Sequence, residues 1–151
     1  MFKKLPLEIF YIYFSPYTAH AIELDGISYP TVEHAYQCQR YADQKISEEI
    51  RNASSPVKAW ETSTKYKHLQ IPEFKNDEYK LAVMKKLNRL KAQQHEEIRQ
   101  ALIDSGDLEI VKHIFTYPPG DGFWDDGQDG TGLNHMGRIW MEIRQGLRSS
   151  N

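Results

Sequence analysis

Apolar residues recur at helical spacing through much of the second half of the chain. Spacings of three and four residues place side chains on one face of an α-helix. Two segments show the pattern most clearly: Leu81, Met84, Leu87 and Leu90 in the first, and Met136, Ile139, Trp140, Ile143 and Leu147 in the second. The pattern predicts helices after Asn76, through 95–105 and after Asn134.

Helix start signals predict further helices upstream. Thr31 precedes a run without Gly or Pro, which predicts a helix from about 31 to 44. A shorter helix is expected at 46–52. The pair Ser55 and Pro56 predicts another helix start, because Ser accepts free amide hydrogens and Pro suits the first turn. Ala59 and Trp60 of that helix are expected to face inward.

The N-terminal pattern is β-like. The run "IFYIYF" at 9–14 is rich in the β-branched and aromatic residues that favour strands. The stretch "AIELDGISYP" at 21–30 reads as two extended pieces around the turn signal Asp25-Gly26. The sequence therefore predicts a mainly α fold with a small N-terminal β-hairpin, α+β by some definitions.

Composition limits the classes of protein that this chain can be. Its 151 residues fit a single domain over 1–151, and 19 basic against 21 acidic residues leave a net charge of -2. Bulk nucleic-acid binding is not expected, since it rewards clustered positive charge. No apolar run approaches the ~18 residues of a membrane span. The single Cys38 gives no internal disulfide and fits a reducing compartment, so a cytoplasmic protein without membrane contact is expected.

One long loop stands out, "TYPPGDGFWDDGQDGTGLN" at 116–134. It holds four aspartates and five of the nine glycines, without Lys or Arg. Loops longer than ~12 to 15 residues inside a domain tend to be functional. The aspartate spacing does not match a helix-loop-helix calcium site, and no histidine or cysteine pair suits zinc. No metal or organic cofactor is expected, and Trp124 is a candidate stacking wall for a planar base.

The predicted helix at 31–44 carries a polar ridge. Glu33, Gln37, Arg40 and Gln44 share one face at spacings of four, three and four. The ridge is either a site for a polar ligand, with Arg40 suited to a phosphate, or the solvated side of an amphipathic helix. The pattern alone favours the solvated side. His34 points about a quarter turn away and is expected to be a packed or capping histidine rather than a catalyst.

Taken together, "YPTVEHAYQ" and the downstream "DGFWDDGQDGTGLNHMGRIWMEIR" resemble the YbiA-like family, also called the NADAR domain. The resemblance spans nearly the whole chain. It implies a mainly α-helical array and an activity that breaks N-glycosidic bonds. Members of similar sequence hydrolyse phosphoribosylated amino-pyrimidine intermediates of riboflavin synthesis, and others remove ADP-ribose from guanine bases.

The resemblance also implies site residues, with three departures. The matching motif positions are Glu33, His34, Gln37, Trp124, Asp126, Asp129 and Asn134. Arg40 stands where the family usually has lysine, which would block a Schiff-base route because Arg is a poor nucleophile. Asp125 adds a charge to the loop. A glutamate common before the loop is replaced by Lys112 or His113, with "TYPPG" as an insertion.

These observations lead to an N-glycosidase hypothesis. The enzyme would separate a base or amine from C1 of a phosphorylated ribose or ADP-ribose, in a small nucleotide or an ADP-ribosylated nucleic acid. Carboxylates suit this reaction because its transition state is an oxocarbenium-like cation. Glu33 and one loop aspartate, Asp129 ahead of Asp126, are expected to flank C1 as the catalytic pair.

Other residues are expected to bind the substrate. Arg40 would hold a phosphate or ribose hydroxyl, Trp124 would stack on the base, and Asn134 would lend helix-start amides to an anion. His34 and Gln37 complete the predicted binding set. Two alternatives stay open at this point: a non-catalytic module that binds ADP-ribose or a nucleotide, and a structural or partner-binding domain.

Overall fold

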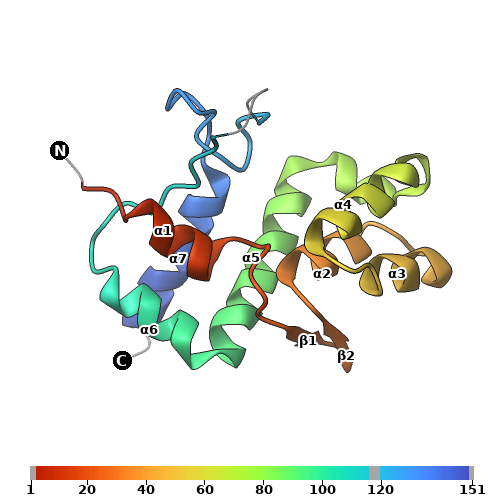
Figure 1. Cartoon of the computed structure of the whole chain (residues 1–151), viewed down its shortest axis with the longest axis horizontal. Helices are drawn as coiled ribbons and strands as arrows, with labels where there is room; N and C mark the ends of the chain where they lie inside the picture. The colour runs from red at the N-terminus through yellow and green to blue at the C-terminus, as the bar shows by residue number, and fades with distance from the viewer. Residues whose placement is uncertain (1–2, 116–119, 150–151) are drawn as a thin grey trace. The chain divides into compact units, whose positions relative to one another are not determined.

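The computed structural model describes residues 3–115 and 120–149, and its internal contacts divide the chain into two units (Figure 1). One unit combines Met1–Ser15 with Glu96–Asn151, and is called the loop unit below because it contains the acidic loop. The other comprises Pro16–His95 and is called the motif-helix unit. That residues 1–151 form one domain stays a prediction.

The motif-helix unit consists of a hairpin and a group of helices. Its elements are β1 (Ile22–Leu24), β2 (Ile27–Tyr29), α2 (Val32–Cys38), α3 (Gln44–Arg51), α4 (Pro56–Lys65) and α5 (Asp77–Gln94), with 3₁₀ turns η2 (Lys67–Leu69) and η3 (Pro72–Lys75) before α5. α2 is the central element, because it packs against α3, α4, α5 and β2.

The loop unit is built around two helices and the N-terminal segment. Its elements are α1 (Leu7–Ile9), the π-helical turn η1 (Phe10–Phe14), α6 (Glu96–Asp104) and α7 (His135–Ser149), and α6 packs against both η1 and α7. After α6 the chain runs beside the N-terminal segment, where the Leu5 N–H donates to the Glu109 carbonyl over 2.8 Å. Trp140 of α7 is fully buried, and its indole N–H donates to the Phe14 carbonyl over 2.9 Å.

Several local predictions are confirmed. The Ser55 hydroxyl accepts the Lys58 N–H at 3.1 Å, with Pro56 in the first turn of α4. Thr31 caps α2. The hairpin turns at Asp25 and Gly26, whose φ angles of 52° and 80° give the backbone twist that two-residue hairpins need. The predicted fold class, mainly α with a small β-hairpin, is correct.

The predicted strand at 9–14 is wrong, because this stretch is helical in the structure. Phe10 and Phe14 lie four residues apart and are buried, whereas Tyr11 and Ile12 between them are exposed. That is helical rather than alternating burial. The Phe14 ring packs against Trp140 with ring centroids 5.1 Å apart, so tertiary packing overrides the local strand preference.

The predicted helix at 31–44 is too long. α2 ends at Cys38, and Gln44 belongs to the next helix. Asp43 caps that helix by accepting the N–H groups of residues 45 and 46. Tyr41 is buried with its hydroxyl donating to the Ser63 carbonyl over 2.5 Å, which requires the chain to turn before it. The polar ridge therefore loses Gln44, and Arg40 lies just beyond the helix.

One predicted core tryptophan lies at the surface. Ala59 is fully buried, but its neighbour Trp60 is 50 % exposed. Successive residues of a helix point about 100° apart, and in α4 this step takes Trp60 from the buried side of the helix, where Ala59 lies, to the exposed side. Burial of Trp140, in contrast, is confirmed.

The two tryptophans give a matched test of the packing. Trp140→Ala is expected to lower the free energy of unfolding by about 3–5 kcal/mol, because it empties a filled core position. Trp60→Ala is expected to change it by no more than about 0.5 kcal/mol, as for most surface positions. Denaturant unfolding followed by circular dichroism measures both, and equal losses would show that the described packing is incorrect.

Candidate active site

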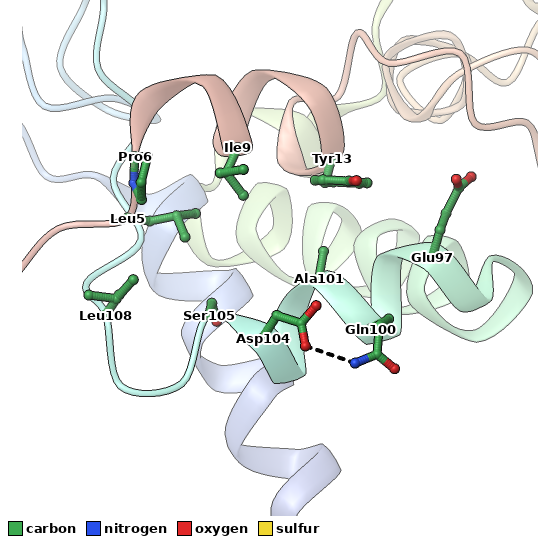
Figure 2. A pocket seen from close by; sticks show the side chains of 10 residues that line it. All are labelled: Leu5, Pro6, Ile9, Tyr13, Glu97, Gln100, Ala101, Asp104, Ser105 and Leu108. Carbon is green, nitrogen blue, oxygen red and sulfur yellow. Dashed lines mark hydrogen bonds between the residues drawn. The ribbon is translucent and has the colours of Figure 1, made fainter.

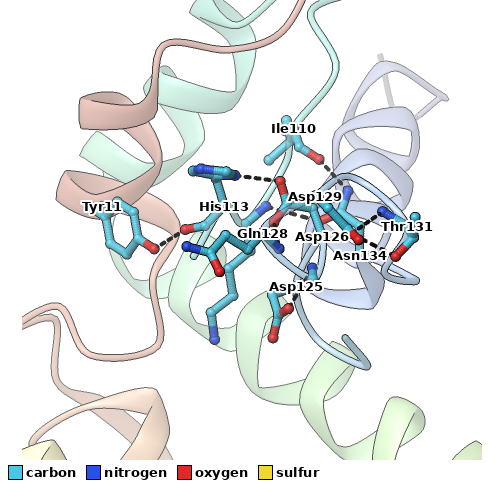
Figure 3. Close-up of polar contacts among 11 residues, drawn as sticks. Tyr11, Ile110, His113, Asp125, Asp126, Gln128, Asp129, Thr131 and Asn134 are labelled. Carbon is cyan, nitrogen blue, oxygen red and sulfur yellow. Dashed lines mark hydrogen bonds and ion pairs between the residues drawn. The ribbon is translucent and has the colours of Figure 1, made fainter. Parts of the chain in front are cut away.

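All four aspartates of the acidic loop shape its backbone. Each accepts the N–H of the residue two positions ahead, forming the turn that Asp side chains favour. The bonds run from Phe123 to Asp121 at 2.9 Å, from Gly127 to Asp125 at 2.8 Å, from Gln128 to Asp126 at 3.0 Å and from Thr131 to Asp129 at 2.9 Å. The carboxylates that give the loop its charge therefore also shape its backbone, and Figure 3 shows three of them, Asp125, Asp126 and Asp129.

The loop closes onto the start of α7. The backbone N–H groups of Asn134, His135 and Met136 donate to the carbonyls of Asp125, Phe123 and Trp124 over 2.9–3.1 Å. The prediction that helix-start amides at Asn134 receive an anion is therefore wrong, since loop carbonyls occupy these donors.

The Asn134 side chain has a different role, which is to hold the segment before the loop. Its amide donates to the Ile110 carbonyl over 3.0 Å, and its carbonyl accepts the Lys112 N–H at 2.9 Å. A Cβ on Gly137 would meet both this side chain and the Ile110 backbone, so only glycine allows the close approach. Asn134 thereby fixes where residues 110–113 run.

Asp126 forms a close ion-pair contact with a histidine that lies before the loop. The Nδ1 atom of His113 is 2.5 Å from the Asp126 carboxylate, which is largely buried, while the His113 side chain is 34 % exposed. Burial raises the pKa of Asp126, but the bonds from His113 and from the Gln128 backbone outweigh it and leave the pKa below its usual value. Asp126 is therefore an anion at neutral pH.

Tyr11 of η1 contacts the backbone of the same histidine. Tyr11 donates a hydrogen bond to the His113 carbonyl (Figure 3). Burial raises the pKa of Tyr11, and the nearby carboxylates of Asp126 and Asp125 raise it further. The Tyr11 hydroxyl and the Asp126 carboxylate therefore both contact His113, the first at its backbone carbonyl and the second at its ring.

Asp129 and Trp124 are more open. Asp129 is exposed and accepts both the hydroxyl of Thr131, at 2.6 Å, and its N–H. The hydrogen bond from the Thr131 hydroxyl is the main reason, and the one from its N–H the next, why the pKa of Asp129 lies below its usual value. Trp124 is half-buried and packs edge-on against Phe123 with ring centroids 4.8 Å apart.

In the motif-helix unit, the polar side chains of α2 are buried. Glu33 is 6 % exposed and Gln37 is 5 % exposed, so the interpretation of this face as solvated is wrong. The Gln37 amide donates to the Glu33 carboxylate over 2.8 Å. Tyr17 lies close by, and burial together with the Glu33 carboxylate raises the pKa of its phenol to about 12.

His34 is a packed and capping histidine, as the sequence predicts. It is almost completely buried, with Nδ1 2.9 Å from the Thr31 hydroxyl and Nε2 3.0 Å from the Ala53 carbonyl. The carbonyl can only accept, so Nε2 carries the proton and Nδ1 accepts from Thr31. Both nitrogens are therefore engaged within the unit.

Arg40 lies between two aromatic rings. Its guanidinium carbon is 5.0 Å from the centre of the Tyr36 ring and 4.9 Å from that of Phe74. Nη1 donates to Gln70 over 3.1 Å and Nη2 to the Tyr36 hydroxyl over 3.4 Å, whereas the buried Nε has no partner among the described residues. The side chain is thus held in place with part of its donor capacity unused.

A largely apolar pocket of about 400 Å³ lies in the loop unit, between the N-terminal helical segment and α6 (Figure 2). Leu5, Ile9, Tyr13 and Ala101 contribute to its walls, with Asp104 at its edge. None of the predicted site residues lines it. Within the described residues, no three His, Cys, Asp or Glu side chains are placed to hold a metal ion.

Sequence reasoning missed three polar residues near the predicted chemistry: Tyr11, Tyr17 and His113. The aromatic residues carry no local signal, because only the folded chain brings them beside carboxylates. His113 had a partial signal, since it is one of two residues, with Lys112, that could stand in place of a family glutamate. Of the proposed insertion "TYPPG" at 116–120, residues 116–119 lie outside the described residues. In the described part of the chain, no helix combines the length and apolar character needed to cross a bilayer.

The chain as a whole is similar to a known protein family. The model of the NADAR domain matches residues 6–148, almost the whole chain. The chain belongs to the NADAR domain family. Glu33, Asp126 and Asp129 are thus residues of a NADAR domain.

Similar proteins agree with this assignment. N-glycosidase YbiA of Escherichia coli strain K12 is 37 % identical over 135 residues, covering 89 % of this chain and 80 % of that protein. An N-glycosidase of Nostoc punctiforme is 31 % identical, covering 90 % and 85 %. A riboflavin biosynthesis protein of Vibrio vulnificus is 32 % identical over 85 % of this chain but only 33 % of its own length. These names confirm the predicted enzyme class, a hydrolase acting on N-glycosyl compounds.

A solved structure supports the fold. The NMR structure of the Escherichia coli protein YbiA matches with a TM-score of 0.79 and 35 % identity, covering 91 % of this chain and 78 % of that one. The predicted YbiA-like helical array is therefore confirmed for this NADAR domain.

The Asp126 carboxylate gives a pH-dependent stability test. Its folded-state pKa is lowered, so its contribution to stability is present above the unfolded pKa of ~3.9 and is lost as pH falls through the folded pKa. Asp126→Asn should therefore lower the free energy of unfolding by about 1–3 kcal/mol at neutral pH. The difference from wild type should shrink towards pH ~3.

Asp121→Asn is the matched control, because it removes the same charge from an exposed residue that makes the same kind of turn. It should change stability by no more than about 0.5 kcal/mol. Urea unfolding at a series of pH values measures both variants. A difference between Asp126→Asn and wild type that is constant with pH would contradict the ion-pair assignment.

Proposed function

We propose that this NADAR domain hydrolyses the bond between a base or amine and C1 of a phosphorylated ribose or ADP-ribose. The observation that carries the proposal is the burial of Glu33. A buried carboxylate that accepts the Gln37 amide keeps a fixed position, from which it can orient or activate the water that attacks C1. The reaction develops a cation at C1 as the glycosidic bond breaks, and a second carboxylate stabilises that cation.

Two carboxylates divide the work in this proposal. Glu33 orients or activates the attacking water, with Gln37 holding the carboxylate in place. A loop carboxylate, Asp129 in preference to Asp126, stabilises the cationic sugar. The lowered pKa values of both loop aspartates keep them ionised at neutral pH, as this role requires. Glu33 and the loop are assigned to one reaction because both belong to the family motif.

Three further residues contribute to binding. Arg40 receives a phosphate or ribose hydroxyl through the donors left over from Gln70 and Tyr36. Trp124, half-buried, stacks on the released base. His34 and Asn134 act by positioning, because their polar atoms are engaged with the protein itself.

The relatives suggest the first substrates to test. One similar protein is named as a riboflavin biosynthesis protein, which favours ribosylamino-pyrimidine phosphates of that pathway. The family resemblance adds ADP-ribosylated guanine. Both are N-glycosides of a phosphorylated ribose, so the same carboxylate chemistry serves either.

Turnover and one substitution test the proposal. The protein is incubated with ribosylamino-pyrimidine phosphates and with ADP-ribosylated guanine nucleotide, and the released sugar phosphate and base are measured by mass spectrometry. Glu33→Gln should lower kcat by about 100-fold or more, because the water loses its oriented base. Glu48→Gln on α3, an exposed glutamate, is the matched control and should keep the wild-type rate.

Each other result has a definite meaning. Tight binding of ADP-ribose by calorimetry without any release of base would support the alternative of a non-catalytic binding module. If the protein neither binds nor turns over these compounds, the result would support the alternative of a structural or partner-binding domain. Wild-type kcat in Glu33→Gln would overturn the role of this carboxylate.

Arg40 is tested by its preference for phosphate. Arg40→Gln should raise KM about 10-fold or more for a phosphorylated substrate and leave the dephosphorylated one nearly unchanged, since it removes a charge-assisted contact. Arg89→Gln, an exposed arginine on α5, is the control. Arg40→Lys should not recover the loss, because a lysine lacks the planar fork and the stacking on Tyr36 and Phe74. An equal rise in KM for both substrates would refute phosphate binding.

A further inference from the structure

The contact between His113 and Asp126 resembles the carboxylate–imidazole arrangement by which a protein orients a histidine for proton transfer. Asp126 accepts the Gln128 N–H as well as the His113 contact, and its pKa is lowered, so the carboxylate is the acceptor. Nδ1 of His113 must therefore carry a hydrogen. The remaining nitrogen, Nε2, is left to exchange a proton with a ligand.

The surroundings of His113 leave Nε2 available. Its Nδ1 contacts Asp126, its carbonyl receives the Tyr11 hydroxyl, and its ring meets Phe115 edge-on at 4.7 Å. Within the described ranges 3–115 and 120–149, Nε2 has no hydrogen-bond partner, and the side chain is 34 % exposed. Among the described residues the imidazole is thus held at Nδ1 and has Nε2 available, and Figure 3 shows the Nδ1 contact with Asp126.

We propose that His113, oriented by Asp126, is the general acid that protonates the leaving nitrogen in the N-glycosidase reaction. The inference rests on the proposed function and adds the proton donor that it lacks. Asp126 and Asp129 stay ionised near neutral pH and cannot supply this proton efficiently, whereas an imidazolium can. Asp126 then acts as a positioning residue, which leaves Asp129 as the loop carboxylate that faces the cation.

The proposed step balances. As the C1–N bond breaks, its electron pair stays on the leaving nitrogen, which takes the proton from Nε2 of His113. Water adds to C1 and releases one proton, and neutral His113 takes up one proton from solvent. The products are the free base with its N–H and the sugar with a hydroxyl at C1.

The charged and titratable groups around His113 predict how pH acts on it. Asp126 contacts the ring, Asp125 and Tyr11 lie in the same corner, and Lys112 precedes it in the chain. An acid must be protonated to act, so kcat should fall at high pH. Asp126→Asn removes the acceptor that orients the ring through Nδ1 and should lower kcat.

The kinetic test uses the substrate that the wild-type protein turns over. His113→Gln should lower kcat by about 100-fold or more and abolish the basic limb, with little change in KM. Added imidazole should partly restore the rate of His113→Ala, which a purely structural role would not allow. His68→Gln, at an exposed histidine, is the control for the His113 variants. Asp121→Asn, at an exposed aspartate, is the control for Asp126→Asn.

A second measurement does not depend on turnover. Nitrogen-15 NMR of the imidazoles should show that neutral His113 carries its hydrogen on Nδ1, and Asp126→Asn should weaken this tautomer preference. Wild-type kcat and pH profile in His113→Gln would overturn this inference while the proposed function stands. No turnover by the wild-type protein would overturn both, and a proton on Nε2 alone would overturn the pairing itself.

Discussion

The burial of polar side chains in α2 is the constraint on which the motif-helix unit depends. All seven residues of this helix are buried, including Glu33, His34 and Gln37. Buried polar groups must find partners, because an unpaired one costs about as much as a lost hydrogen bond. Gln37 pairs with Glu33, and His34 connects the helix cap at Thr31 to the Ala53 carbonyl. Those bonds place the carboxylate and fix which neighbours the helix can have.

Local signals in the sequence were sufficient wherever a short-range bond decides the structure. Ser55 and the Asp25-Gly26 turn act through bonds or φ angles within a few residues, so their roles could be predicted. Phe14 and Trp60 could not be placed in this way. Whether an aromatic residue lies in the core depends on what the rest of the chain brings against it, and that information is absent from a ten-residue window.

In the candidate site, too, some features could be predicted from the sequence and others depend on the folded chain. The family motif supplies the identity of Glu33 and the loop aspartates, but not the way in which they are held. The Asx turns follow from the chemistry of aspartate and could have been predicted from Asp125 and Asp126 preceding flexible residues. The contact of His113 with Asp126 could not, because it joins positions 13 residues apart across the part of the loop at 116–119.

The structural role of the loop aspartates is compatible with the chemical role proposed for them. A carboxylate that accepts backbone N–H groups is held at one position and kept ionised, since those bonds stabilise the charged form. Fixed charge of this kind needs no reorganisation when a cation develops, which is the main advantage of a protein site over water. Asp126 and Asp129 gain this property from the same bonds that shape the loop.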